Sequence, residues 1–171
     1  IIYGDSVLIT PRAIAALVDE ARSHSGPLAM LTSTLDDPTG YGRIVRDDAG
    51  RAVRVQEERD CSPAERAIKE WNPGIYAAGR RFFEEALASL EPNNAQKEYY
   101  LTDIVAFAAR RGERVTSVAS NPAVMDGVND RAQLALADAA KPRGELARAR
   151  RFGARHGDTA RPQRAAALQV A

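Results

Sequence analysis

The sequence predicts an α/β protein built on a mixed, mostly parallel sheet that is covered by helices on both faces. Short apolar segments alternate with longer segments of helical period, and clusters of turn-forming residues separate them. The chain has 171 residues, of which 44% are hydrophobic, so it can bury one ordinary core. Alternation of strands and helices is typical of a parallel sheet with both faces buried.

The first predicted elements are a short strand and a helix. Residues 1–3 are apolar and predict a strand that stops before Asp5. Thr10 is placed to cap a helix in which Pro11 takes the first position, where a proline loses no hydrogen bond. Apolar residues then repeat at helical spacing, and Gly26 ends the helix.

A buried strand and a hairpin follow. Residues 28–35 predict a largely buried strand, and residues 36–42 (DDPTGYG) are dense in turn formers. The segments 42–46 and 52–57 predict the two arms of a hairpin around the sequence DDAG.

The second half of the chain alternates between helices and strands. Ser62 and Glu65 have the spacing of a capping box, which predicts a short helix that runs to about Trp71. The remaining predictions are a turn at 72–74 into a strand over 74–78, a helix over 82–90, a helix over 103–111 capped by Thr102, a strand over 114–120, and a helix over 131–140 capped by Asn129 or Asp130.

Charge marks a boundary near residue 140. Residues 141–171 contain eight Lys/Arg and two acidic residues, which gives this segment about +6 and leaves residues 1–140 with about −5. We therefore expect a folded domain over 1–140 and a basic, Arg/Ala-rich, partly disordered tail over 141–171. Clustered arginine can contact nucleic acid, but Phe152 is the only aromatic residue there, so no nucleic-acid partner is expected.

Cysteine content and hydropathy are those expected of a cytoplasmic protein. Cys61 is the only cysteine, so no internal disulfide is possible, and a reducing compartment fits. No apolar run approaches the ~20 residues that cross a bilayer, and no membrane association is expected.

Polar clusters adjoin three of the predicted strands, at residues 3–5, 71–74 and 127–130. Ligands of doubly wound sheets collect beyond the carboxyl ends of the strands. Asp5 and Asn129 together offer a carboxylate and an amide oxygen, which are hard ligands that suit Mg²⁺. The alternatives are that Asp5 is a turn residue and Asn129 a helix cap.

Three further positions could face a ligand. The two glycines of the 36–42 loop let the backbone approach a ligand closely. The alternative is an ordinary hairpin turn, which has a similar sequence. Glu57 ends a strand, where a solvated glutamate is the alternative. Thr102 ends a block, residues 93–103, whose neutral donors and acceptors suit a sugar or a phosphate at a helix N-terminus, and its alternative role is that of a plain cap.

The sequence offers no evidence for a catalytic nucleophile. His24, His156 and Cys61 stand apart from any partner in the sequence, and no CxxC, HExxH or Walker motif occurs. Metal-assisted positioning of a substrate is the chemistry that remains.

Five motifs occur in order between residue 1 and about residue 137. They are YGD, LDDPTGYGRIVRDDAG, VQEERDCSPAERAIKEWN followed by GIY, NNAQKEYYLTDIV and GVNDRAQLA. Together they closely resemble the uridyltransferase domain of the bacterial bifunctional N-acetylglucosamine-1-phosphate uridyltransferase/glucosamine-1-phosphate acetyltransferase. LDDPTGYGRI and NNAQKEYYLTDI are highly specific for that enzyme among sugar nucleotidyltransferases.

The resemblance implies a Rossmann-like nucleotidyltransferase fold and a Mg²⁺-dependent reaction that converts UTP and N-acetylglucosamine 1-phosphate to UDP-N-acetylglucosamine and pyrophosphate. This reaction supplies peptidoglycan and lipopolysaccharide synthesis, and the full-length family is trimeric. By position, the resemblance makes Asp5 and Asn129 the catalytic Mg²⁺ ligands, Tyr3, Gly4 and Asp5 a nucleotide-sugar contact, Gly42 a backbone contact, Glu57 and Asn72 the groups that hold the amino-sugar hydroxyls, and Thr102 a contact on the sugar-phosphate side.

The sequence also departs from the family pattern. The family's glycine-rich loop and its uracil-reading residues would precede residue 1, and no hexapeptide repeat follows residue 140. Ser6 and Val7 replace the usual proline-containing sequence after YGD. We therefore expect residues 1–171 alone to turn over UTP poorly or not at all, and pyrophosphate release from UTP and N-acetylglucosamine 1-phosphate would contradict this.

Two alternative functions stay open on the sequence. One is a sugar-1-phosphate nucleotidyltransferase that uses another base, against which the NNAQKEYYLTDI block argues. The other is a non-catalytic, partner-binding fragment.

Overall fold

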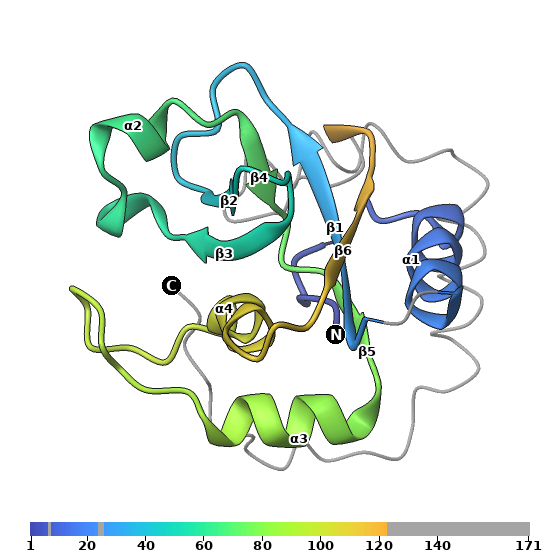
Figure 1. Ribbon diagram of the computed structural model, residues 1–171. Coiled ribbons are helices and arrows are strands. Elements are labelled where there is room, and N and C mark those ends of the chain that lie inside the picture. Colours follow the sequence, from blue (N-terminus) through green and yellow to red (C-terminus); the bar gives the residue numbers. More distant parts are fainter. Residues whose placement is uncertain (7, 24–25, 123–171) are drawn as a thin grey trace, which may run out of the picture. The chain divides into compact units, whose positions relative to one another are not determined.

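Strand β1 (Leu28–Thr34) is the central strand of a sheet, and helices pack on either side of it (Figure 1). The computed structural model describes residues 1–6, 8–23 and 26–122, all within the first of the two units of the chain, Ile1–Gly127. The other elements in chain order are α1 (Pro11–Ser23), β2 (Gly42–Arg46), β3 (Ala52–Gln56), a 3-10 turn (Glu58–Asp60), α2 (Pro63–Arg66), β4 (Glu70–Asn72), β5 (Tyr76–Ala78), α3 (Arg80–Ala88), α4 (Asp103–Arg110) and β6 (Val115–Ala119).

Most predicted elements are confirmed within a few residues. The hydroxyl of Thr10 accepts a hydrogen bond from the amide of Ala13 at 3.2 Å and so caps α1 as expected. The hairpin, the central strand and helices α3 and α4 also lie where the sequence predicts them. The predicted helix over 131–140, Asn129 and the tail over 141–171 lie outside the described residues.

The described strands form a mixed sheet in the order β3-β2-β4-β1-β5, with β6 also paired to β1. Strand β6 is parallel to β1, whereas the four other pairings are antiparallel. The prediction of a mixed sheet is confirmed, but the prediction that it is mostly parallel is wrong for these strands. A parallel neighbour needs a crossover of a dozen or more residues, and short links such as the turn at 47–51 return the chain antiparallel.

Strands β4 and β5 both run antiparallel to β1, with a bulge between them. Ser33 faces Trp71 and Met30 faces Tyr76, so three steps along β1 match five steps along the β4–β5 segment. The two additional residues are accommodated around residues 73–75. A bulge of this kind bends a strand and re-aims its side chains.

The helix predicted to run to Trp71 is shorter than expected. The capping box of Ser62 and Glu65 is confirmed, but α2 ends at Arg66, and Trp71 lies in β4 with 1% of its surface exposed. Burial of a large indole between two neighbouring strands stabilises more than helix propensity over a few residues can.

Residues 1–3 do not form the predicted strand. Ile1 alone pairs with Tyr76, exchanging backbone hydrogen bonds of 2.7 and 3.0 Å. The chain then turns at Gly4 and Asp5, and the amide of Ser6 bonds to the carbonyl of Tyr3 at 3.2 Å. The turn ends the pairing before a strand can develop.

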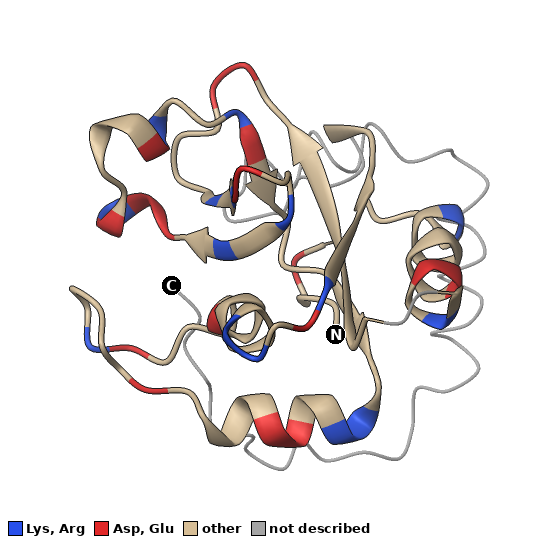
Figure 2. Ribbon diagram, viewed as in Figure 1, with Lys and Arg blue, Asp and Glu red and all other residues tan. Residues whose placement is uncertain are grey.

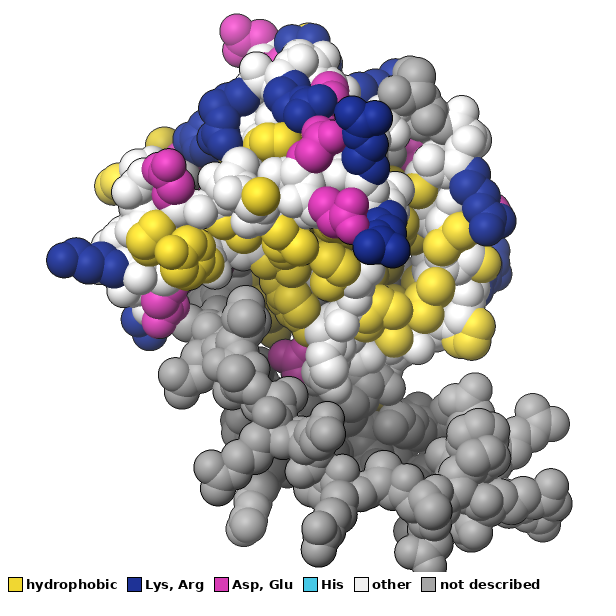
Figure 3. Space-filling view, turned by 90° about the horizontal axis from the view of Figure 1, so that it is seen from below, with side chains coloured by type: hydrophobic (Ala, Val, Ile, Leu, Met, Phe, Trp, Pro, Cys, Tyr) yellow, Lys and Arg dark blue, Asp and Glu magenta, His cyan; other side chains and the backbone are white. Residues whose placement is uncertain are grey.

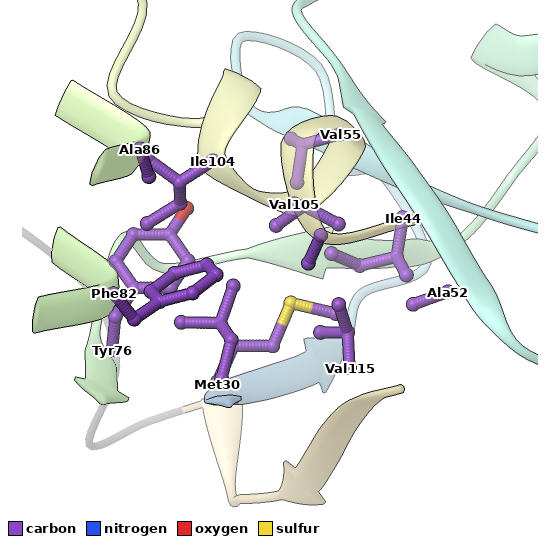
Figure 4. Close-up of a cluster of buried hydrophobic side chains, with 12 residues drawn as sticks. Met30, Ile44, Ala52, Val55, Tyr76, Phe82, Ala86, Ile104, Val105 and Val115 are labelled. Carbon is purple, nitrogen blue, oxygen red and sulfur yellow. The ribbon is translucent and has the colours of Figure 1, made fainter. Parts of the chain in front are cut away.

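The two faces of β1 belong to two separate hydrophobic clusters. Leu28 and Met30 point to the side of α3 and α4, in the cluster that Figure 4 shows. Ala29 and Leu31 point to the opposite side, where Leu17 of α1 packs. This alternation follows from the two-residue period of a strand, and it confirms helices on both faces.

Charged residues are spread over the helices, strands and loops of the described region (Figure 2), and on the face that Figure 3 shows, hydrophobic side chains gather in a broad area among them. On α3, Arg80 and Arg81 pair with the glutamates four residues later. Among the residues that the structure describes, the exposed large hydrophobic ones are Ile1, Ile2, Leu87 and Tyr99. Exposure of this kind is ordinary and identifies no interaction site by itself. Within the described residues, no helix combines the length and the apolar run that crossing a membrane requires.

Candidate active site at the bulge

Gly42 and Asn72 stand opposite each other in the pairing of β2 with β4. A Cβ atom at Gly42 would lie 2.7 Å from Cγ1 of Val55 and 3.4 Å from both carboxylate oxygens of Glu57. Position 42 therefore has no room for a side chain. The glycine brings bare backbone next to the carboxylate of Glu57.

Glu57 follows β3 directly and is held from below by the start of α4. Its Oε1 accepts a hydrogen bond of 2.8 Å from the hydroxyl of Thr102. Burial raises the pKa of Glu57, the hydrogen bond from Thr102 opposes that shift, and the nearby carboxylates of Asp103 and Asp60 add to it. Glu57 is therefore not a solvated strand-end residue.

Thr102 is not a plain helix cap. Its backbone is already helical, with φ −60° and ψ −21°, and its side chain makes no capping hydrogen bond. Its hydroxyl points to Glu57 instead, and the residue is 5% exposed. The alternative of a plain helix cap is therefore not what the structure shows, and contact of Thr102 with a ligand stays a prediction.

Asn72 is buried, and both ends of its amide are held. Its Nδ2 donates to the hydroxyl of Tyr76 at 2.8 Å, and its Oδ1 accepts from the amide of Gly74 at 3.3 Å. Gly74 has a φ of +74°, which a side chain would strain. The bulge between β4 and β5 thus holds the side chain of Asn72 in place.

The ring of Tyr3 packs against the bulge at Gly74. A Cβ atom at Gly74 would overlap the ring of Tyr3, so the ring lies directly against the glycine backbone. Burial raises the pKa of Tyr3 to about 12, with smaller contributions from the carboxylates of Glu57 and Asp5. Tyr3 therefore lies near enough to Glu57 and to Asp5 for both carboxylates to affect its pKa.

Asp5 lies in the turn after Tyr3 and is half-buried, whereas Gly4 is exposed. The turn geometry that the sequence offered as an alternative for Asp5 is present, and it leaves a ligand role untested. Among the described residues, no group of three or more His, Cys, Asp or Glu side chains could hold a metal ion. Asn129, the other expected Mg²⁺ ligand, is not among the described residues, so the metal site stays a prediction.

A buried ion pair fastens the glycine loop to this site. Arg43 is 1% exposed, and its guanidinium donates to Oε2 of Glu58 at 2.6 Å and to the carbonyl of Tyr41. The same carboxylate oxygen accepts from the amide of Gly40 at 3.4 Å. The loop that precedes Gly42 is therefore tied to the residue that follows Glu57.

Sequence reasoning missed Arg43, Glu58 and Tyr76. In a hairpin, an arginine is expected on the face exposed to solvent. A tyrosine in a strand is expected to be a residue of the hydrophobic core. The one available signal was position, because each of the three lies within four residues of a predicted site residue.

A hollow of about 360 Å³ opens beside Glu57, between β3 and α4. The loop over residues 93–100 closes one side of it, through Asn93, Asn94 and Tyr100. The hydroxyl of Tyr100 accepts a 2.7 Å hydrogen bond from Nε2 of the Gln96 side chain, which orders the loop. The polar block thus lines a hollow beside Glu57, and Gly42, Asn72 and Thr102 are not part of its lining.

Several curated proteins similar to this chain carry the name bifunctional protein GlmU. The chain is 49% identical over 136 residues to the bifunctional protein GlmU of Alcanivorax borkumensis and 48% identical over 139 residues to that of Sorangium cellulosum. It is 45% identical over 162 residues to that of Chromohalobacter salexigens. The chain is a homologue of the GlmU proteins.

The relationship covers most of the chain but a minor part of each GlmU protein. The three alignments span 79%, 81% and 94% of the chain, and 30%, 29% and 35% of the respective relatives. The chain therefore spans about a third of the length of the GlmU proteins it matches. No protein-family model matches the chain.

A solved structure of another protein has the same fold as this GlmU homologue. The neighbour is a Bacillus anthracis protein that carries the name of a glucose-1-phosphate thymidylyltransferase and was crystallised with sucrose. The TM-score is 0.53 with 22% sequence identity, over 74% of this chain and 48% of the neighbour. The Rossmann-like nucleotidyltransferase fold expected from the sequence is thus confirmed.

Proposed function

We propose that this chain provides the sugar-phosphate side of a nucleotidyltransferase site that makes UDP-N-acetylglucosamine and pyrophosphate from UTP and N-acetylglucosamine 1-phosphate. The observation that carries the proposal is the meeting of Gly42, Glu57, Asn72 and Thr102. These residues come from four separate segments and gather at one end of the β2–β3 hairpin. Homology to the GlmU proteins supports the same reaction.

The gathered groups suit the recognition of a sugar with several hydroxyls. Glu57 has one oxygen held by Thr102, and its second oxygen is available to accept from a hydroxyl. Asn72 has a second amide hydrogen to donate. The bare backbone at Gly42 lets the ligand approach closely.

The reaction needs alignment of substrates rather than a covalent intermediate. Phosphoryl-type transfer is accelerated by positioning of the reactants and by neutralisation of charge. In our proposal, Asp5 and Asn129 hold a Mg²⁺ ion, which supplies the charge neutralisation at the phosphates. The residues at the bulge orient the sugar phosphate for in-line attack on the α-phosphorus of UTP.

A binding experiment on residues 1–171 tests the proposal without requiring turnover. Isothermal titration calorimetry measures the affinity of the chain for N-acetylglucosamine 1-phosphate, with glucose 1-phosphate as competitor of different chemistry. The variant Glu57→Gln is expected to bind about 10-fold to 100-fold more weakly, because a hydrogen bond to a charged group contributes roughly 1.5–3 kcal/mol. Glu84→Gln is the matched control, because Glu84 is exposed on α3 and far from Glu57 in the chain.

Three results would count against the proposal. Absence of binding to any sugar phosphate would remove it, as would equal affinity in wild type and Glu57→Gln. Equal or tighter binding of glucose 1-phosphate would favour a sugar-1-phosphate nucleotidyltransferase of different specificity.

We also propose a cytoplasmic setting, which suits the single buried thiol of Cys61, and a trimeric assembly of the full-length protein.

A further inference from the structure

Asn72 can direct a hydrogen-bond donor toward a ligand only if its amide keeps one orientation. An unrestrained amide can rotate and exchange the places of its oxygen and nitrogen. Here Gly74 donates to Oδ1 and Tyr76 accepts from Nδ2. The two contacts together distinguish the oxygen end from the nitrogen end.

The amide of Gly74 can only donate, so it decides which end of the Asn72 amide is the oxygen, and the hydroxyl of Tyr76 then holds the nitrogen end in place. Tyr76 is 1% exposed and belongs to the buried cluster of Figure 4, which surrounds its ring. Its backbone is fixed as well, because it pairs with Met30 and with Ile1. The hydroxyl that contacts Asn72 is therefore held in place by β5, which follows the bulge, and by the core around the ring.

The bulge explains why Tyr76 can reach Asn72 at all. Residues 72 and 76 would stand on the same face of a regular strand but about 13 Å apart, at ~3.3 Å per residue. The two additional residues between β4 and β5 shorten this separation, and the side chains meet at 2.8 Å. The contact is thus a product of the bulge and not of strand periodicity.

We propose that Tyr76 is a positioning residue of the site, which fixes the amide of Asn72 so that its second Nδ2 hydrogen faces the sugar phosphate. This proposal rests on the proposed function, because it assumes that Asn72 contacts that ligand. Tyr76 itself does not touch the ligand. Burial raises the pKa of Tyr76 well above its ordinary value, so the hydroxyl stays neutral and keeps its hydrogen-bonding capacity.

The variant Tyr76→Phe tests the proposal, since it keeps the ring in the core and removes only the hydroxyl. We expect it to bind N-acetylglucosamine 1-phosphate about 5-fold more weakly than wild type. Ser89→Ala is the control for the loss of a hydroxyl, because Ser89 is exposed at the end of α3 and donates to the carbonyl of Ala86, and it should bind as wild type does. Circular dichroism at the titration temperature checks that the variants are folded.

A double-mutant cycle separates positioning from general loosening of the fold. If Tyr76 acts through Asn72, the change Tyr76→Phe should have no further effect on affinity in an Asn72→Ala background. An equal loss in both backgrounds would overturn the proposal, and so would wild-type affinity of Tyr76→Phe itself.

Side-chain NMR decides the proposal even if the chain binds no sugar phosphate. Absence of binding would end the proposed function, while the resonances of the Asn72 amide group report on its hydrogen bond directly. We expect the two amide protons of Asn72 to shift and to exchange faster with solvent in Tyr76→Phe. Unchanged resonances would overturn the positioning role, independently of any activity.

Discussion

The hydroxyl of Thr102 donates a 2.8 Å hydrogen bond to Oε1 of Glu57, across 45 positions of the chain. The bond joins the residue that precedes α4 to the residue that follows β3. It stabilises the charged form of a carboxylate whose pKa is raised by burial. One hydroxyl therefore influences both the position and the charge of Glu57.

Replacing Thr102 by valine should make stability more sensitive to pH. A carboxyl whose pKa is raised on folding contributes stability that is fully present below its unfolded pKa and lost as pH rises through its folded pKa. The ordinary pKa is 4.5, and loss of the Thr102 bond moves the folded pKa of Glu57 still higher. Urea unfolding should show a deficit of about 1–2 kcal/mol at pH 7 and a smaller one at pH 4.5. Thr102→Ser keeps the hydroxyl and should show little deficit, and a pH-independent deficit in Thr102→Val would contradict the argument.

An alanine at position 42 should destabilise the hairpin and disturb Glu57. Its methyl group would meet Val55 at 2.7 Å, which the core cannot relieve without a shift of β3. We expect Gly42→Ala to lower the free energy of unfolding by about 1–3 kcal/mol. Gly79→Ala is the control, because a Cβ atom there has no atom within 4 Å, and it should cost less than about 1 kcal/mol. Equal denaturation midpoints for the two variants would show that the tight packing at Gly42 is unimportant.

Loss of the buried Arg43–Glu58 pair should cost more than loss of an exposed pair. In Arg43→Met, the carboxylate of Glu58 loses its buried partner and the 36–42 loop loses its anchor. Breaking a buried pair from one side typically costs about 3–5 kcal/mol, and because Glu58 is 25% exposed and keeps its pairing with Arg66, we expect about 2 kcal/mol. Arg80→Met, which breaks an exposed pair on α3, should change stability by less than about 1 kcal/mol. Thermal unfolding of both variants measures the difference, and similar losses would refute the role of burial.

The capping box of α2 should contribute stability that acid removes. Hydrogen bonds from Ser62, followed by the pairing with Arg54, lower the pKa of Glu65 to about 2. A carboxyl whose pKa is lowered on folding contributes stability that is present above its unfolded pKa, 4.5, and lost as pH falls through its folded pKa. Glu65→Gln should therefore be about 1 kcal/mol less stable than wild type at pH 6.5, with a smaller difference at pH 3. Asp48→Asn, at the exposed hairpin tip, controls for the removal of a carboxylate, and a constant difference for Glu65→Gln would count against the capping box.

Hydrophobic periodicity predicted most of the elements because it reports which face of a segment is buried. Strand β1, the hairpin and helices α3 and α4 each carry a clear period, and all are confirmed. Periodicity says nothing of strand direction, which explains the wrong expectation of a mostly parallel sheet. The capping box of Ser62 and Glu65 located the start of α2 but not its end, so the predicted helix ran too far, to Trp71.

The candidate site was predictable where a residue belonged to a recognised motif. Gly42, Glu57, Asn72 and Thr102 were named from such motifs, and the structure brings them together. Contacts that depend on side-chain geometry were not predictable. The bond between Asn72 and Tyr76 exists because the strand bulges, and no local pattern of residue types specifies that irregularity.

The bulge between β4 and β5 sets a limit on how this protein can be improved for stability. A shortened segment that lacked two residues could pair with β1 along an uninterrupted ladder, and it would gain hydrogen bonds that the present chain forgoes. The same deletion would turn Asn72 away from Gly74 and Tyr76. Under the proposed function, a more robust sheet and ligand binding therefore place opposite demands on residues 73–75.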